Sequence, residues 1–210
     1  MKNPQIVFLV IIIGLSLVFG GYLLAPSAPT TNGANQEQAP AQVNPELLNN
    51  VNSPMIGKKD ARAKVVIFSD FLCPYCKTAH ETLNSLLGKF PDDTSVTYRN
   101  FIVHPESEIL ARAAEAAALQ GQFQKMNDVL FSKTVESTEE AVVALAKEIG
   151  LDSERFKNDL NSDQVKQRIE KDNSDAKEMN LGGTPTVFLN EASVDDFSNL
   201  EAAVTKMLGK

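Results

Sequence analysis

The only two cysteines among the 210 residues are Cys73 and Cys76, and two residues separate them. They follow a mostly apolar run at positions 65–71, which is typical of a strand buried on both faces. Pro74 fits the first turn of a helix, where a missing N–H costs nothing. A cysteine pair between a buried strand and a helix can close and reopen a small disulfide, so this stretch constrains the fold and predicts redox chemistry.

The residues around the pair predict a strand–helix–strand unit. The segment after the cysteines carries apolar residues at helical spacing and ends at the turn-forming residues Pro91-Asp92-Asp93. Positions 95–103 predict the next strand, in which Val96 and Tyr98 face one side and Arg99 the other. A strand, a helix and a strand in this order form a βαβ unit.

A helical pattern fills positions 106–180. Five helices are predicted there, and the third begins with a capping box formed by Ser137 and Glu140. The charged residues between Asp152 and Glu178 are interpreted as solvated helix faces.

Strand character returns near the C-terminus at positions 186–189, and a last helix is predicted over 197–208. A βαβ half and a terminal strand-plus-helix half therefore flank a block of helices. The predicted fold is α/β, with an all-helical insertion at about 105–180.

The N-terminal residues differ in composition from the rest. Residues 6–25 carry no charge, which matches the roughly 20 apolar residues of a membrane-spanning helix. Residues 1–25 are therefore predicted to be an N-terminal signal anchor or transmembrane helix. A cleaved signal peptide is the alternative, although its apolar region is usually shorter. Because Lys2 is the only Lys or Arg before Lys58, the positive-inside rule predicts a single-pass cell-membrane protein whose C-terminal domain is extracytoplasmic.

Two further parts follow the predicted anchor. Residues 26–54 contain prolines among Asn, Gln, Thr, Ala and Ser and are predicted to be a tether that cannot bury enough apolar surface to fold. Residues 55–210 are long enough for one domain with a real core. The net charge is −7 and there is no basic stripe, so we expect no nucleic-acid partner. A monomer is expected.

The position of each cysteine predicts its role. Cys73 falls at the predicted helix N-terminus, where the helix dipole and unpaired N–H groups favour a thiolate. The backbone N–H and the thiol of Cys76 are the expected hydrogen-bond donors to that sulfur. We therefore predict that Cys73 is the attacking nucleophile and that Cys76 is the buried resolving thiol.

Three other interpretations of the pair compete with redox exchange. A zinc site needs about four ligands, but besides the cysteines the chain offers only His80 and His104, so no metal is predicted. Structural or solvated roles are expected for both histidines. A permanent disulfide closing so short a loop would constrain little of the unfolded chain. The third alternative is that the two thiols are incidental.

Two motifs resemble those of DsbA-like thiol:disulfide oxidoreductases of the thioredoxin superfamily. They are Phe71-Leu72-Cys73-Pro74-Tyr75-Cys76 and, after the helical block, Gly183-Thr184-Pro185-Thr186 before a strand. The resemblance covers residues 55–210 and implies a thioredoxin-like fold with an all-helical insertion. It further implies that Pro185 is a cis-proline facing the disulfide and that the backbone of Thr184 pairs with the substrate chain.

The spacing between the motifs separates members of the superfamily. The active-site dipeptide Pro74-Tyr75 resembles that of glutaredoxins. The long, mostly helical stretch between Cys76 and Pro185 instead resembles the insertion of DsbA-type proteins. We follow the architecture rather than the dipeptide.

Two positions depart from the family's pattern. The family commonly has a buried acidic residue six positions before the first cysteine, where this chain has Ile67. Asp70 is then either a substitute proton acceptor for Cys76 or a solvated carboxylate at the strand end, and the solvated carboxylate is the preferred interpretation. Tyr75 stands where strongly oxidising relatives carry histidine and supplies no cation to the thiolate, which predicts a less oxidising enzyme.

Three functions follow from these predictions. The first is a membrane-anchored oxidase that introduces disulfides into translocated cysteine-containing proteins and is reoxidised by a membrane partner, DsbB-like or otherwise quinone-linked. The second is a reductase or isomerase kept in the dithiol form. The third is a redox-inactive peptide-binding or chaperone module. The sequence favours the first.

Overall fold

The computed structural model describes residues 44–50 and 52–210. The predicted signal anchor at residues 1–25 and most of the predicted tether at 26–54 lie outside the described residues. Within the described part of the chain, no helix combines the length and the apolar character that crossing a bilayer requires.

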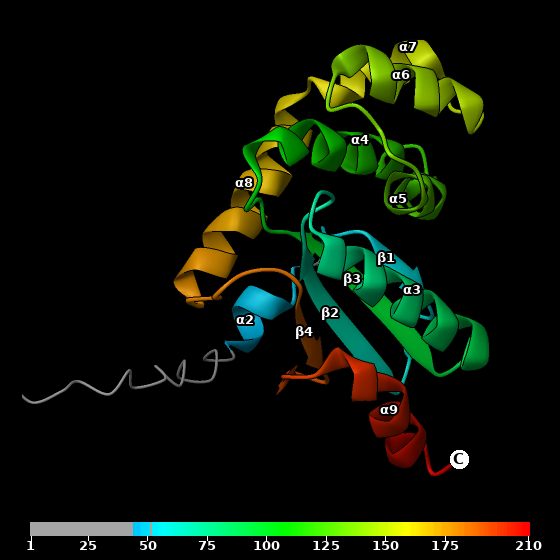
Figure 1. Cartoon of the computed structure of the whole chain (residues 1–210), viewed down its shortest axis with the longest axis vertical. Coiled ribbons are helices and arrows are strands. Elements are labelled where there is room, and N and C mark those ends of the chain that lie inside the picture. The colour runs from blue at the N-terminus through cyan, green and yellow to red at the C-terminus, as the bar shows by residue number, and fades with distance from the viewer. Residues whose placement is uncertain (1–43, 51) are drawn as a thin grey trace, which may run out of the picture. The chain divides into compact units, whose positions relative to one another are not determined.

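A mixed β-sheet is the framework of the domain (Figure 1). Its strands are β1 (Met55–Gly57), β2 (Ala63–Ser69), β3 (Thr94–Asn100), β4 (Thr186–Leu189) and β5 (Ala192–Val194), in the order β1-β3-β2-β4-β5. β2 pairs in parallel with β3 and antiparallel with β4. Lys64 is the one exposed position of β2, as expected for a strand covered on both faces.

α3 (Pro74–Lys89) connects the parallel strands β2 and β3, which confirms the predicted strand–helix–strand unit. Cys73 is its N-cap residue and Pro74 occupies its first turn. The buried face of α3 packs in the main core through Ala79, Leu83 and Leu86.

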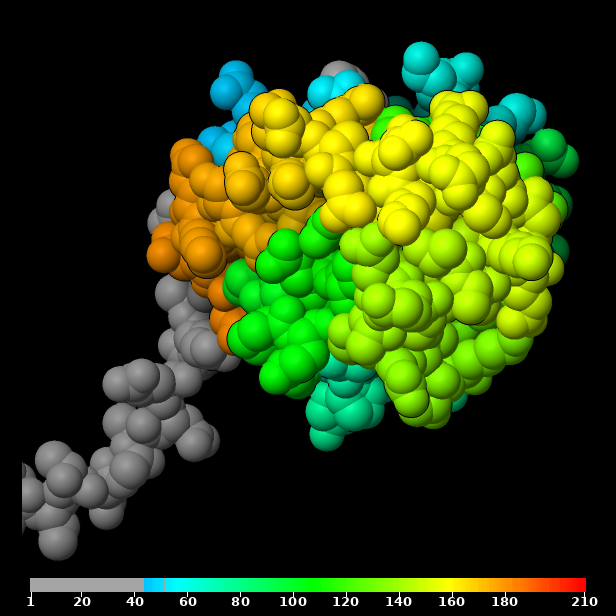
Figure 2. Space-filling view, turned by 90° about the horizontal axis from the view of Figure 1, so that it is seen from above, coloured from blue at the N-terminus to red at the C-terminus, as the bar shows by residue number. Residues whose placement is uncertain are grey.

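Five helices lie between β3 and β4 in the described chain and form the predicted insertion. After the 3-10 turn η1 (Pro105–Ser107) come α4 (Glu108–Ala118), α5 (Phe123–Ser132), α6 (Glu139–Glu148), α7 (Ser153–Leu160) and α8 (Asp163–Glu178). α4 contacts each of the other four, and its many alanines allow that close approach. Figure 2 looks onto the insertion and shows α6 and α7 covering much of the visible face.

The C-terminal half of the fold is completed by η2 (Phe197–Asn199) and α9 (Leu200–Leu208), in the place of the predicted last helix. Leu200, Val204 and Leu208 of α9 are buried in the main core. The structure is thus a thioredoxin-like α/β fold with a helical insertion.

The predicted capping box of the third insertion helix is wrong by one residue. The N-cap of α6 is Thr138, whose hydroxyl accepts a hydrogen bond from the Ala141 N–H at 3.2 Å. Ser and Thr are both good N-cap residues, and the sequence offered both in succession. The helix therefore begins at Glu139, one position later than Ser137 would have placed it.

The predicted tether also extends too far toward the domain. A short helix, α2 (Pro45–Leu48), lies within it, and Leu48 is buried in a core cluster with Phe68 and Phe188. The Arg99 guanidinium donates hydrogen bonds to the carbonyl oxygens of Leu47 and Leu48. The packed domain therefore begins before Met55, because this segment covers part of the second face of the sheet.

The interpretation of all charges between Asp152 and Glu178 as solvated is wrong for Asp172 and Asp175. Both carboxylates are buried and form ion pairs with Arg99, which is itself 1% exposed. The sequence placed Arg99 on the side of its strand opposite Val96 and Tyr98. α8 covers that side of β3, so the alternating polar residue meets two carboxylates instead of water.

Candidate active site

Cys73 lies where β2 ends and α3 begins. It is only 6% exposed, and its thiol donates a hydrogen bond to the Thr184 carbonyl oxygen at 3.3 Å. The Cys76 N–H donates to the Cys73 carbonyl oxygen at 3.1 Å, not to the sulfur as predicted. The predicted position at the helix N-terminus is confirmed, whereas the predicted donor to the sulfur is wrong because the first turn of α3 uses that N–H.

Cys76 is one turn further into α3 and is fully buried. Its sulfur packs with Cys73 and Phe131 and accepts a hydrogen bond from the Asp70 N–H at 3.5 Å. Burial raises the pKa of Cys76 to about 12, although Ser69, the Asp70 N–H and Thr184 each lower it in part. Cys76 is therefore a protonated thiol at neutral pH, and both cysteines are free thiols in this structure.

The second sequence motif reaches the cysteines through the sheet. β4 runs antiparallel to β2, with Thr186 opposite Phe68, so the start of β4 lies beside the end of β2 that leads to Cys73. The Thr184–Pro185 peptide bond just before β4 is cis, as the resemblance implied. The structure thus brings Thr184 and Pro185 to the cysteine pair across more than a hundred residues of sequence.

Exposed apolar side chains form a rim beside the cysteine pair. Tyr75 is 70% exposed, and Leu72 and Val103 are exposed to about two-fifths. The buried carboxylate of Asp70 holds the two sides of this rim together, since it accepts hydrogen bonds from the backbone N–H groups of Leu72 and Val103 at 2.8 Å each. A peptide approaching Cys73 would meet this rim.

Asp70 is buried, so its interpretation as a solvated strand-end carboxylate is wrong. Besides the two rim residues, it accepts hydrogen bonds from the His104 N–H and the Ser107 hydroxyl, both at 2.9 Å. The His104 ring lies 3.2 Å from its other oxygen. The sequence did not show this because the loop after β3, which supplies the donors, folds over the strand end. Asp70 positions this loop and turns its N–H, not its carboxylate, toward Cys76.

His80 is buried in α3 and stacks on Phe131 with ring centroids 4.7 Å apart. Its Nε2 lies 3.0 Å from a carboxylate oxygen of Asp128, and its Nδ1 lies 3.2 Å from both the Tyr98 hydroxyl and the Asn127 amide nitrogen. Hydrogen bonds from His80 and Asn84 hold the pKa of Asp128 below its usual value, against the effect of its partial burial. This contact set fits the structural role that was predicted for His80.

The position that commonly carries an acid in the family is apolar in the structure as well. Ile67 is fully buried in the main core. A buried acid that sequence reasoning missed is Glu115 of α4, whose Oε1 accepts a hydrogen bond from the Asn100 amide at 2.9 Å. The signal that could have found it is a single acid among the alanines of a buried helix, at positions 113–117.

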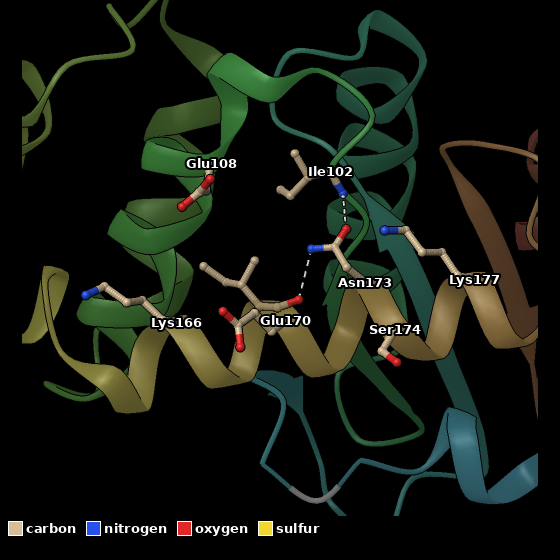
Figure 3. Close-up of a pocket in the computed structure, with 8 residues that line it drawn as sticks. Ile102, Glu108, Lys166, Glu170, Asn173, Ser174 and Lys177 are labelled. Atoms are coloured by element: carbon tan, nitrogen blue, oxygen red, sulfur yellow. Dashed lines mark hydrogen bonds between the residues drawn. The ribbon is translucent and has the colours of Figure 1, made fainter.

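Two open pockets among the described residues lie apart from the cysteines. One is formed by α8, the N-terminus of α4 and the loop after β3, and Figure 3 shows the residues that line it. In it, the Asn173 side chain accepts from the Ile102 N–H at 2.7 Å and donates to the Ile169 carbonyl at 2.9 Å. Its polar side chain is thus engaged within the protein. Among the described residues, no group of three or more His, Cys, Asp or Glu side chains is placed to hold a metal ion.

The chain is similar to known proteins along most of the described domain. A family model described as thioredoxin matches residues 49–207. Among curated proteins, the chain is 34% identical over 178 residues to a Na(+)/H(+) antiporter NhaA of Herminiimonas arsenicoxydans, covering 83% of this chain and 28% of that protein. It is 36% identical over 139 residues to an NhaA 1 antiporter of Mycolicibacterium vanbaalenii, covering 64% of this chain and 22% of that protein. The chain thus spans about a quarter of the length of these relatives.

Solved structures share the fold. A thioredoxin-like oxidoreductase from Silicibacter pomeroyi has a TM-score of 0.70 and 30% identity, covering 80% of this chain and 99% of that one. BdbD from Bacillus subtilis has a TM-score of 0.66 and 25% identity, covering 76% of this chain and 95% of that one. The thiol-disulfide exchange protein alpha-DsbA2 from Wolbachia pipientis has a TM-score of 0.69 and 20% identity, covering 77% of this chain and 90% of that one. At this identity the likeness is one of fold alone.

Proposed function

The chain belongs to the thioredoxin family, among the DsbA-like thiol-disulfide oxidoreductases, and from this premise we propose that it oxidises thiol pairs in other proteins through a Cys73–Cys76 disulfide. The observation that carries the proposal is the unequal setting of the two thiols. Cys73 lies at a helix N-terminus beside the Thr184 carbonyl, whereas Cys76 is fully buried. The Cys73 sulfur is therefore placed to react with a partner protein, whereas the Cys76 sulfur stays buried.

The exchange follows from this placement. A substrate thiolate attacks the Cys73 sulfur of the oxidised enzyme, the Cys73–Cys76 bond breaks, and its electron pair goes to the Cys76 sulfur, which takes up a proton. The second substrate thiol then attacks the mixed disulfide and releases Cys73 as a thiolate, which the N-terminus of α3 stabilises. The substrate leaves with a disulfide, and the enzyme keeps two electrons and becomes a dithiol.

The rim and the cis-proline loop would hold the substrate during this exchange. Leu72, Tyr75 and Val103 offer exposed apolar surface, and the Thr184 backbone lies against the Cys73 sulfur. An extended, cysteine-containing peptide fits such a site, because backbone groups of the loop before β4 can pair with it while the rim contacts its side chains.

The direction and place of the reaction are part of the proposal. The uncharged residues 6–25 support an anchored enzyme with its domain outside the cytoplasm, where disulfides persist. Translocated proteins would be the substrates, and a membrane-bound, quinone-linked partner would reoxidise the dithiol. One observation favours the reverse direction: Tyr75 is exposed and brings no cation to the Cys73 sulfur. A reductase or isomerase is therefore the second candidate.

The test starts from the protein with its Cys73–Cys76 disulfide formed. The oxidised protein is mixed with a peptide that carries two thiols, and peptide disulfide is followed by mass spectrometry. Wild type should form the peptide disulfide, Cys73→Ser should form no mixed disulfide, and Cys76→Ser, after loading through an activated peptide disulfide, should retain a peptide at Cys73. In cells, alkylation with a mass tag should find the pair mostly oxidised. A mostly reduced pair would support the reductase, and a Cys73→Ser strain without any phenotype would favour a binding module.

A further inference from the structure

Cys76 must exchange a proton each time it leaves or attacks a disulfide, if the proposed function holds. Its sulfur is fully buried, so it lacks the bulk water that would carry that proton. As a leaving group with a high pKa, it leaves slowly unless a proton reaches it. Ile67 lies on the same side of β2 as Ser69, but its apolar side chain cannot supply a proton.

A small cavity lies under the ends of β2 and β3, next to side chains that pack with Cys76. Phe71 and Phe131, which pack with the cysteine pair, form part of its wall, and Ser69, Glu115 and Asn127 contribute polar groups. The space in which the centre of a water molecule can lie is about 10 Å³. That is close to the minimum for one ordered water.

Three polar atoms on this wall are buried and lack a hydrogen-bond partner among the described residues. They are the Ser69 hydroxyl oxygen, Glu115 Oε2 and Asn127 Oδ1. Glu115 Oε2 lies 3.3 Å from the Arg168 guanidinium, but without hydrogen-bond geometry. A water in the cavity would find the two to four polar partners that buried waters have. Ser69 also lies near enough to the Cys76 sulfur to lower its pKa, although the two form no hydrogen bond in this structure.

Glu115 is suited to give and take a proton near neutral pH. Burial raises its pKa to about 7, against the nearby positive charges of Arg168 and Arg99, and the negative charge of Asp172 raises it further. The Asn100 amide donates to its other oxygen. The other ionisable groups on the cavity wall are Tyr98 and Arg99. Burial raises the pKa of Tyr98, so its hydroxyl stays neutral, and the Arg99 guanidinium is held in ion pairs with Asp172 and Asp175.

We propose that Glu115 is the proton reservoir for Cys76, acting through a water held in this cavity and through the Ser69 hydroxyl. When a substrate thiolate attacks Cys73, the S–S bond breaks, the Cys76 sulfur receives the electron pair, and the protonated Glu115 gives up the proton that converts it to a thiol. In the reverse step, the Cys76 thiol loses its proton to the Glu115 carboxylate while its sulfur bonds to Cys73 and displaces the partner's thiolate.

The other nearby groups are less suited to this role. Both carboxylate oxygens of Asp70 already accept hydrogen bonds: Oδ2 from the loop after β3 and from Ser107, and Oδ1 from the Leu72 N–H. His80 meets the cavity wall at Asn127 and at the Tyr98 hydroxyl, both through Nδ1, and its other nitrogen is paired with Asp128. Glu115 is therefore a positioning residue for the proton, supplied by the insertion rather than by the strand that carries the acid in related proteins.

The test isolates the step in which Cys76 reacts. The dithiol protein is mixed with an excess of oxidised glutathione at a series of pH values between 5.5 and 9, and samples are quenched in acid. Mass spectrometry then follows the mixed disulfide at Cys73 as it decays to the Cys73–Cys76 disulfide. The wild-type decay should show an inflection near pH 7. Glu115→Gln should remove that inflection and slow the decay at pH 7 by roughly tenfold to a hundredfold. Glu115→Asp should restore part of both.

Asp175→Asn is the matched control, because it makes the same carboxylate-to-amide change in the buried charges around Arg99 without lining the cavity. It should keep the inflection. Ser69→Ala removes the hydroxyl that connects the cavity water to Cys76 and should slow the decay of the mixed disulfide. This variant tests the inference even if Glu115→Gln fails to fold. Unchanged decay and inflection in Glu115→Gln would overturn the inference while leaving the proposed function intact. If wild type formed no mixed disulfide at Cys73, the proposed function itself would fail.

Discussion

β2 and α3 place two thiols at the active site, whereas α4 and α8 bury charges beneath the ends of β2 and β3. The thiols are three positions apart, and the first turn of one helix determines their different surroundings. The charges come from distant parts of the chain: Arg99 of β3 pairs with Asp172 and Asp175 of α8, and Glu115 of α4 shares the Asn100 amide with this group.

The difference shows how burial acts on each kind of group. A buried thiol stays neutral and needs few partners, so Cys76 is simply harder to ionise. A buried carboxylate needs partners, and Asp172 has the Arg99 guanidinium and the Asn100 N–H. Its pKa is still raised, because burial outweighs these contacts. The active-site region therefore has a local origin, and the charged region exists only once the insertion has folded onto the sheet.

The largest effect is expected from breaking the charged region. Arg99→Met would leave Asp172 and Asp175 buried without their cation, which should lower the free energy of unfolding by about 3–5 kcal/mol in urea titrations at neutral pH. The control is Arg62→Met, whose partner Asp93 and own side chain are both partly exposed, and it should lose less than about 1 kcal/mol. Equal losses in the two variants would contradict the distinction between buried and surface pairs.

A pH dependence should follow from Glu115. Its pKa in the folded state, about 7, lies above the ordinary value of 4.5. The folded protein therefore binds this proton more tightly than the unfolded chain, and the stability it contributes is full below about pH 4.5 and is lost as the pH rises through about 7. The unfolding free energy of wild type minus that of Glu115→Gln should fall by up to about 3 kcal/mol over this window and then stay level. Urea unfolding at several pH values measures it, and a flat difference would refute the assignment.

The cysteine region can be tuned by a smaller change. Tyr75→His would bring a cation next to the Cys73 thiolate and should shift the equilibrium with glutathione roughly tenfold toward the dithiol, the effect of about one pKa unit on the thiol. Because Tyr75 is exposed, Tyr75→Phe should leave that equilibrium unchanged. The measurement is a glutathione titration read by alkylation and mass spectrometry. No shift in Tyr75→His would mean that a residue other than Tyr75 sets the potential.

The smallest expected effect lies in α6 of the insertion, outside both regions. Thr138→Ala removes the N-cap of α6 and should lower the unfolding free energy by about 1 kcal/mol. Ser137→Ala, one residue earlier, should change it by only a few tenths. If Ser137→Ala had the larger effect, the helix would begin where the sequence pattern first placed it.

The sequence predicted the parts of the molecule that local patterns determine. The buried strand, the helix beginning at Pro74 and the helical block all follow from spacing and turn residues. The position of Thr184 and Pro185 at the cysteines came from resemblance, and the antiparallel pairing of β4 with β2 explains it.

Polar residues were harder to predict, because their surroundings depend on which element covers them. Asp70 was interpreted as solvated, but the loop after β3 covers it and supplies its donors. Asp172 and Asp175 lie on a highly charged helix, and only the packing of α8 against β3 shows that two of its carboxylates face inward. Glu115 could have been noticed as one acid among alanines, yet its neighbours on β3 and α8 are not evident from the sequence.

The central claim is the division of work between the two thiols, and selective alkylation tests it most directly. The dithiol protein is treated briefly with iodoacetamide at neutral pH, and the modified peptide is identified by mass spectrometry. The account predicts that Cys73 is labelled first and that Cys76 reacts only after unfolding. Labelling of Cys76 first, or of both at the same rate, would contradict it.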